Sequence, residues 1–210
     1  MKSNSQASQD IFVREITRHK HNGTFLEIGA NHPITHNNTY ILESEYGYKG
    51  IMVEYDKSFE QSYITYRPNS VHILGDAQTT DYKTILETHQ FPQNIDYLQV
   101  DLDVDNKSTI NTLELLNTTV LPYYKFATVT FEHDIYRGNY FNTRELSRKI
   151  FKDNGYVLVF PDVSLFWEGS YKEFEDWYVH TDLVSSDIIN KIKSDVSLSH
   201  EEIAARLQTI

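Results

Sequence analysis

Cysteine is absent from the 210 residues of this chain, so disulfide bonds and thiolate metal sites are excluded. The sequence also lacks any apolar run that approaches the roughly 18 residues needed to span a membrane. Residues 1–10 are polar and lack the apolar centre of a signal peptide. These absences predict a soluble protein of the cytoplasm.

Basic residues are scarce, with 19 lysines and arginines against 30 acidic residues and a formal net charge of −11. This charge opposes binding to nucleic-acid backbones and to anionic membranes, so we expect neither as a partner. Hydrophobic residues make up 40% of the chain and aromatic residues 13%, which is enough apolar material for one substantial core. We therefore expect a single domain.

Short apolar segments alternate with amphipathic ones along most of the chain. The pattern predicts strands at residues 25–28, 50–54, 71–74, 95–100, 126–131, 156–160 and 174–179. It predicts helices at residues 10–20, 39–47, 58–66, 81–88, 108–116 and 143–154, and a capping box at 199–202 opens a last helix. This alternation predicts an α/β fold with a Rossmann-like, doubly wound, mostly parallel sheet and helices on both faces.

The same pattern suggests how the chain is divided. We expect an N-terminal segment and helix over residues 1–23, the main domain over 24–184 and a helical extension of that domain over 185–210. The extension is expected to cover the core or to mediate a homodimer.

Acidic residues follow three of the predicted strands. The segment 24–31, TFLEIGAN, is an apolar strand that carries Glu27 and ends in a turn at Gly29, while Glu54 and Asp76 follow the next two strands. Open α/β sheets bind nucleotide-like ligands in the crevice at the carboxyl ends of their strands. Glu54 suits a ribose diol because a carboxylate accepts two hydroxyl protons, and Asp76 suits an adenine amino group.

A nicotinamide dinucleotide would share the strand, the turn and the ribose carboxylate. It requires glycines that let backbone amides approach a pyrophosphate, but this turn has only Gly29, and Pro33 has no amide proton. No lysine or arginine lies between Glu27 and Lys49 to balance phosphate charge. A row of acids repels a dianion and attracts a sulfonium and an ammonium group, so S-adenosylmethionine fits better.

At this point the chain resembles the class I S-adenosylmethionine-dependent methyltransferases, and within them the FkbM-type family. The resemblance covers about residues 24–180 and is carried by the segments 25–31, 38–43, 47–51 and 95–101 together with Pro33 and Glu54. It implies a seven-stranded sheet with the last strand antiparallel, and methyl transfer to a hydroxyl oxygen of a sugar or polyketide-like acceptor. The chain departs from the family pattern at residues 102–105, which read LDVD.

The resemblance also implies roles for individual residues. The methionyl part of the cofactor is expected at Glu27, Gly29, Ala30 and Asn31, the ribose at Glu54 and Tyr55, and the adenine at Asp76 and Ala77. Asp101 is expected beside the methyl group or the acceptor.

Transfer to a hydroxyl needs a base, because a neutral hydroxyl is a poor nucleophile. We expect His133 to act as this base and Asp101 to position the acceptor, with Asp103 as the rival base. The alternative for His133 is a hydrogen-bonded histidine at a strand end. No metal is expected, although a divalent ion held by Asp101, Asp103 and His133 remains a second interpretation.

Aromatic residues are frequent in two late segments. Residues 136–142, YRGNYFN, mix aromatic faces with amide and guanidinium donors, which suits a polyhydroxylated acceptor or else a structured loop. A second group is expected to serve core and hairpin packing and consists of Phe166, Trp167, Tyr171, Phe174, Trp177 and Tyr178. Two hypotheses follow: an O-methyltransferase acting on a small, carbohydrate-like molecule, or an inactive module of the same fold that binds a glycan or a protein partner.

Overall fold

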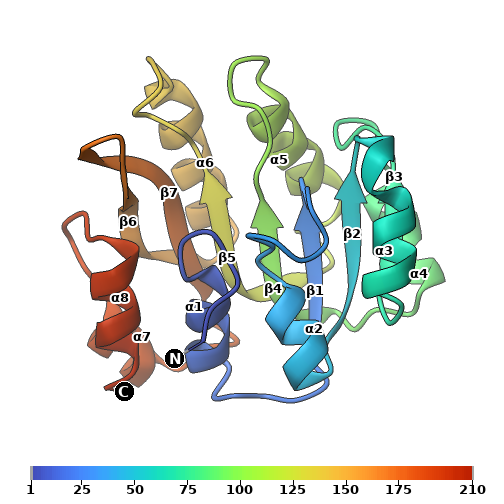
Figure 1. Cartoon of the computed structure of the whole chain (residues 1–210). Coiled ribbons are helices and arrows are strands. Elements are labelled where there is room, and N and C mark those ends of the chain that lie inside the picture. The colour runs from blue at the N-terminus through green and yellow to red at the C-terminus, as the bar shows by residue number, and fades with distance from the viewer. Residues whose placement is uncertain (1, 210) are drawn as a thin grey trace.

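The computed structural model describes residues 2–209, and its centre is one seven-stranded sheet. The strand order is β3-β2-β1-β4-β5-β7-β6 (Figure 1). Strands β2 and β3 are thus added on one side of β1, and β4 to β7 on the other side. The strands are β1 (Thr24–Ile28), β2 (Lys49–Glu54), β3 (Val71–Leu74), β4 (Asn94–Val100), β5 (Lys125–Glu132), β6 (Tyr156–Trp167) and β7 (Ser170–His180).

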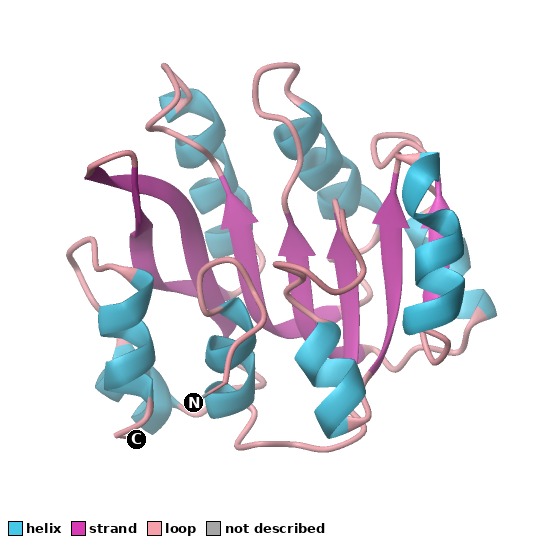
Figure 2. Ribbon diagram, in the orientation of Figure 1, coloured by secondary structure: helices cyan, strands magenta, loops and turns pink. Residues whose placement is uncertain are grey.

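Helices cover both faces of the sheet, giving three layers (Figure 2). They are α1 (Gln9–Ile16), α2 (Tyr40–Tyr46), the 3₁₀ turn η1 (Lys57–Phe59), α3 (Glu60–Tyr66), α4 (Tyr82–Thr88), α5 (Ser108–Thr119), α6 (Phe141–Asp153), α7 (Ser186–Ile192) and α8 (His200–Leu207). Helices α5 and α6 lie behind the sheet in Figure 1, whereas α1, α2, α3 and α8 lie in front. Over residues 2–209, no helix is both long and apolar enough to cross a membrane.

The pairing confirms the expected sheet. Strands β1 to β5 pair in parallel, and β7 runs antiparallel to both β5 and β6. The carboxyl ends of β1, β2, β3, β4 and β5 therefore meet along one edge, which is the upper edge in Figure 1.

One hydrophobic cluster of the core contains residues from both ends of the chain. Phe12 of α1 stacks on Trp177 of β7 with a centroid distance of 4.8 Å. The same cluster contains Ile192 of α7 and Ile203 of α8, all of them buried. Both terminal segments thus share one core with the sheet, and the expected boundaries at residues 24 and 184 stay a prediction.

The structure departs from the predicted elements at three places. The helix expected over 10–20 ends at Ile16, because Arg18 and His19 adopt positive φ angles of 54° and 53°. Helix α7 was not predicted. Strands β6 and β7 extend well past the predicted 156–160 and 174–179.

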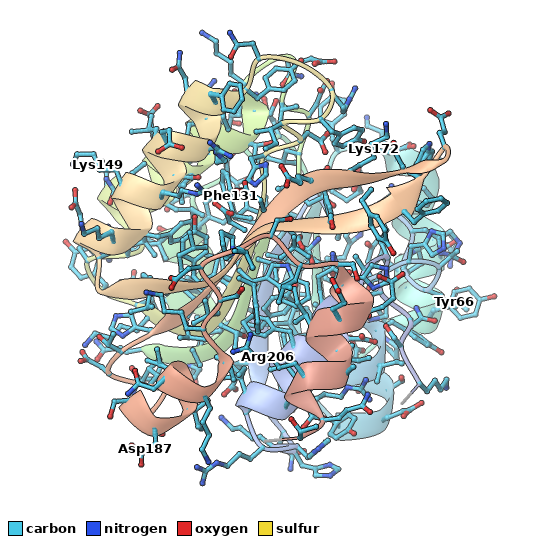
Figure 3. All side chains as sticks on the ribbon, turned by 90° about the vertical axis from the view of Figure 1, so that its left-hand side faces the viewer. Tyr66, Phe131, Lys149, Lys172, Asp187 and Arg206 are labelled. Atoms are coloured by element: carbon cyan, nitrogen blue, oxygen red, sulfur yellow. The ribbon has the colours of Figure 1, made fainter. Side chains whose placement is uncertain are left out.

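The extra length forms a hairpin that projects beyond the body of the sheet (Figure 3). Near its tip Phe166 and Tyr171 meet edge to face, with exposed fractions of 59% and 60%. Trp167 is 52% exposed. These three aromatic residues were expected to serve packing; they pack within the hairpin but not in the core, which takes Phe174, Trp177 and Tyr178.

Candidate cofactor and acceptor site

The turn after β1 depends on a glycine. Gly29 has a φ of 82°, a region that side chains with a Cβ disfavour. A Cβ at this position would lie 1.7 Å from the carbonyl oxygen of Asp101. The chain after β4 therefore passes directly against the turn after β1, and only glycine allows this approach.

The backbone amides of this turn are already bonded. Gly29 N and Ala30 N donate to the carbonyl oxygen of Val53, at 3.0 and 3.1 Å. Asn31 N donates to the Glu54 carboxylate at 2.6 Å. A pyrophosphate would need such amides free to point at it, so the turn is unsuited to a dinucleotide.

Glu54 is fixed at the end of β2 by three backbone N–H groups. One carboxylate oxygen accepts from Tyr55 and Asp56, both at 2.8 Å, and the other accepts from Asn31. Such charge-assisted bonds hold the carboxylate in one orientation. Three of its about four lone-pair sites are used, and the remaining one, on the oxygen that accepts from Asn31, is available to a ligand hydroxyl.

A cavity of about 370 Å³ opens at this edge of the sheet. Its wall consists of Gly29, residues 53–55, residues 75–78, Leu102, Asp103, Asn106 and Ser108. Three of these residues are acidic, and none of them is lysine or arginine. The wall therefore favours a cationic or neutral ligand over a phosphorylated one.

Comparison with solved structures shows that the fold of this chain is similar to that of known methyltransferases. The fold resembles a precorrin-6y C5,15-methyltransferase from Geobacter metallireducens, with a TM-score of 0.54, 8% identity and coverage of 83% of this chain and 88% of that one. It also resembles the plantazolicin methyltransferase BamL in complex with SAH, with a TM-score of 0.53, 9% identity and coverage of 83% and 85%.

A third structure is a TehB-like SAM-dependent methyltransferase from Corynebacterium glutamicum, with a TM-score of 0.50, 11% identity and coverage of 82% and 88%. The chain has the fold of the class I S-adenosylmethionine-dependent methyltransferases. No protein-family model matches the sequence, and no curated protein matches it either.

Glu27 lies beneath the loop that follows the turn rather than in the cavity wall of this methyltransferase fold. It is 1% exposed and accepts from Thr39 Oγ1 at 2.8 Å and from Asn37 Nδ2 at 3.2 Å. Burial raises the pKa of Glu27 to about 7, although the buried Arg67 opposes this shift. The contacts show Glu27 holding the loop over residues 31–39.

His133 directly follows β5 and lies near Arg148 of α6. It is fully buried, and its Nε2 atom lies 3.5 Å from one oxygen each of Asp162 and Asp176. These three residues form a set that could in principle ligate a metal. Arg148 binds both carboxylates, at 2.9 Å from Asp162 and 2.7 Å from Asp176, so local charge opposes a cation there.

A second acidic group lies at the same edge of the sheet, at the ends of β4 and β5. Asp101, which follows β4, and Glu132, which ends β5, are both half-buried and lie side by side on neighbouring strands. Asp134 is 5% exposed and pairs with Arg137 at 3.0 Å. This group adjoins the cavity through Leu102 and Asp103.

The structure thus separates the candidate residues into two sets. It brings together around the cavity Gly29, Glu54, Tyr55, Asp76, Ala77 and Asp103. Outside the cavity wall lie Glu27, Ala30, Asn31, Asp101 and His133. Within residues 2–209, the acidic residues close enough to share a metal ion with His133 are Asp162 and Asp176, not Asp101 and Asp103.

Sequence reasoning missed six residues of the cavity wall, namely Val53, Gly75, Gln78, Leu102, Asn106 and Ser108. Asn106 and Ser108 precede or begin α5, where Asn106 Oδ1 accepts from the Ser108 amide at 2.9 Å. A polar segment after a strand and before a helix was the only signal that could have indicated them.

Proposed function

We propose that this chain is an S-adenosylmethionine-dependent methyltransferase of the FkbM type that methylates a hydroxyl oxygen of a small, carbohydrate-like molecule. The observation that carries this proposal is the cavity at the carboxyl ends of β1 to β3, with Glu54 fixed in its wall by three backbone amides. The expected homodimer and the cytoplasmic location stay predictions.

The residues of the cavity fit the cofactor part by part. Glu54 offers a carboxylate to the ribose hydroxyls, and the 78% exposed ring of Tyr55 lies beside it. Asp76 and the buried Ala77 supply a polar group and an apolar surface for the adenine. Bound there, S-adenosylmethionine would supply an electrophilic methyl group, and Gly29 lets the chain around Asp101 approach this end of the cavity.

A second cavity supports a hydroxylated acceptor. It measures about 380 Å³, and its wall includes the aromatic rings of Tyr136, Phe141 and Tyr171 together with Arg144 and Glu173. The Arg144 guanidinium lies 5.0 Å from the centre of the Phe141 ring. Rings beside charged hydrogen-bonding groups match the mixed apolar and hydroxyl surface of a sugar.

Calorimetry with S-adenosylmethionine tests the cofactor site. We expect Glu54→Ala to weaken binding by roughly 10-fold to 100-fold, because it removes charge-assisted hydrogen bonds to the ribose. Glu60→Ala, which removes an exposed carboxylate of α3 outside the cavity wall, is the matched control and should bind like the unaltered protein. If the unaltered protein has no measurable affinity for S-adenosylmethionine, the proposed function is refuted.

The acceptor class is tested separately. Radiolabelled S-adenosylmethionine is incubated with a panel of methyl glycosides, and label in the glycoside is counted. Tyr171→Ala should weaken the apparent affinity for an accepted glycoside while leaving cofactor affinity unchanged. Label in none of the glycosides, from a protein that binds S-adenosylmethionine, would refute the carbohydrate-like acceptor.

A further inference from the structure

A row of three carboxyl groups crosses the sheet on one face. Strands β4 and β5 are in register with Val100 opposite Phe131, which places Asp101 opposite Glu132 at the next position. Across the other neighbour, Glu132 is opposite Glu175 of β7. Because side chains at paired positions point to the same face, the three carboxyl groups lie next to one another.

The members of this row have different surroundings. Glu175 is buried and held by donors of its own chain, since Gln9 Nε2 donates to it at 3.2 Å and Trp177 Nε1 also donates to it. Among residues 2–209 no such donor reaches Glu132; its carboxyl group meets the carboxyl groups of Asp101 and Asp134. Within the same residues Asp101 accepts only a weak contact from Gln99 Nε2, at 3.5 Å.

A proton shared by Asp101 and Glu132 removes the repulsion between their two carboxylates. Burial raises the pKa of Asp101, and burial together with the Asp101 charge raises the pKa of Glu132 far more. Two adjacent carboxylates cannot both stay ionised at low cost, so the pair binds one proton as a unit. Glu132 holds that proton and donates it to Asp101, which keeps the negative charge.

Asp134 supplies a second sign that a proton or a ligand belongs in this acidic group. Its side chain is 5% exposed and faces Glu132. One of its oxygens binds Arg137, but the other, Oδ1, is buried and has no hydrogen-bond donor among the described residues. A buried acceptor atom without a donor is costly unless a ligand or a proton satisfies it.

We propose that Asp101 is the base of the transfer step and that Glu132 is its positioning residue, the two carboxyl groups holding one shared proton before the reaction. This inference rests on the proposed function. As the acceptor O–H bond breaks, its proton passes to the ionised oxygen of Asp101. The electron pair of the acceptor oxygen forms the bond to the methyl carbon, and the electron pair of the broken carbon–sulfur bond stays on sulfur.

Other charged groups act on the pair from every neighbouring element. Asp134 and Tyr136 face it from the chain after β5, Glu54 from the end of β2 and Glu175 from β7. Arg137 lies beyond Asp134, between it and Asp105. The acids outnumber this one partly exposed arginine, so the local field favours retention of the proton.

Infrared spectroscopy at neutral pH reads the shared proton without any acceptor. The unaltered protein should show several protonated-carboxyl bands, one of which disappears in Glu132→Gln and shifts in Asp101→Asn. The matched control Glu27→Gln removes a different buried carboxyl group, whose pKa burial raises to about 7. The Glu27 band should be insensitive to Asp101→Asn, because the groups that act on Glu27 are Arg67, Thr39 and Asn37. If Glu132→Gln does not fold, the Asp101→Asn spectrum tests the same pair.

The transfer assay then tests the two roles. Asp101→Asn should lower turnover by roughly 100-fold or more with cofactor affinity unchanged. Glu132→Gln, which keeps a hydrogen-bond donor to Asp101, should retain most turnover, whereas Glu132→Leu should lose it. Glu60→Gln, which changes an exposed carboxylate outside both cavity walls, should match the unaltered protein.

Several outcomes would overturn the inference. Glu132 is ionised if its Gln variant leaves the spectrum unchanged, and the proton is not shared if Asp101→Asn leaves the Glu132 band in place. Equal turnover in Glu132→Gln and Glu132→Leu would reduce Glu132 to a space-filling role. Failure of the proposed function is distinguishable, since it appears as absent cofactor binding while the spectra still report on the pair.

Discussion

The acidic side chains at the two halves of the sheet edge are held in place by different partners. At the β1 to β3 half, the acidic groups follow short parallel strands directly, and backbone amides of the next turn hold Glu54 in the cavity wall. At the β6 and β7 hairpin, Asp162 and Asp176 lie on paired strands, and the side chain of Arg148 binds both.

This difference shows what a sequence pattern can indicate. The ends of parallel strands meet at one edge whatever their exact pairing, so acids at those ends predict a site. An antiparallel hairpin brings residues together only through its register, which here contains bulges between Leu158 and Ser164. The following predictions test whether the two halves depend on backbone and side-chain contacts as described.

Gly29→Ala should have the largest effect. The new Cβ would overlap the Asp101 carbonyl, and φ is positive, so we expect a loss of more than about 3 kcal/mol in the free energy of unfolding. Gly75→Ala is the control, because a Cβ there meets no atom within 4 Å. Denaturant unfolding measures both variants, and equal stability would show that the β1 turn is not constrained as we describe.

Arg148→Leu tests the other half. Burial raises the pKa of Asp176, but hydrogen bonds from Arg148, together with the nearby His133 ring, hold it well below the usual value. Without the guanidinium, Asp176 stays buried without its main partner, at a cost of about 3 kcal/mol near neutral pH.

The cost of Arg148→Leu should shrink in acid. A lowered pKa stabilises the fold above the ordinary aspartate pKa of 3.8 and loses this contribution as pH falls. Lys149→Leu, which breaks an exposed ion pair on the same helix, should cost less than about 0.5 kcal/mol. A cost for Arg148→Leu no greater than for Lys149→Leu would refute the role of buried ion pairs at this half.

Glu27→Gln should change the pH dependence of stability at the β1 half. Because the pKa of Glu27 is raised from 4.5 to about 7, the folded chain binds a proton that the unfolded chain has released. Stability from this group is complete below pH 4.5 and falls as pH rises towards 7.

Thermal unfolding should therefore show that Glu27→Gln loses roughly 2 kcal/mol less than the unaltered protein between pH 5 and pH 8. Glu60→Gln, an exposed variant, should follow the unaltered protein. Parallel pH profiles for all three proteins would contradict the assignment of a protonated Glu27.

Ser199→Ala should have the smallest effect and tests how the long hairpin is anchored. Ser199 caps α8 by accepting from Glu202 N, and it bridges to Ser164 of β6. Loss of the cap should cost about 1 kcal/mol. Ser185→Ala is the matched control, because Ser185 precedes α7 without a capping hydrogen bond. Equal thermal stability of the two variants would show that the Ser199 cap does not stabilise α8.

The sequence predicted much of the fold because its signals are local. Alternating apolar segments located all seven strands, and Gly29, Glu54 and Asp76 marked the edge where the cavity lies. The capping box at Ser199 and Glu202 was also confirmed. Each of these signals depends on residues within a few positions of one another, so no knowledge of distant contacts was needed.

His133 shows where such reasoning stops. A histidine after β5 suits a base by its chemistry, yet its ring is buried against Asp162 and Asp176, which come from the β6 and β7 hairpin. Glu132, one residue earlier, lies on the opposite side of the strand and meets Asp101. Which of two adjacent residues faces the site depends on strand register, and a shift of one residue would exchange them.

The amino-acid sequence by itself determined the parallel α/β sheet, the glycine turn and the acids at its strand ends, because periodicity and turn chemistry act over short stretches. The tertiary structure alone decided that Glu27 supports a loop, that His133 is buried among ion pairs and that Asp101 lies beside Glu132. Those outcomes depend on which distant segments pack together, and burial then sets the protonation of each carboxyl group.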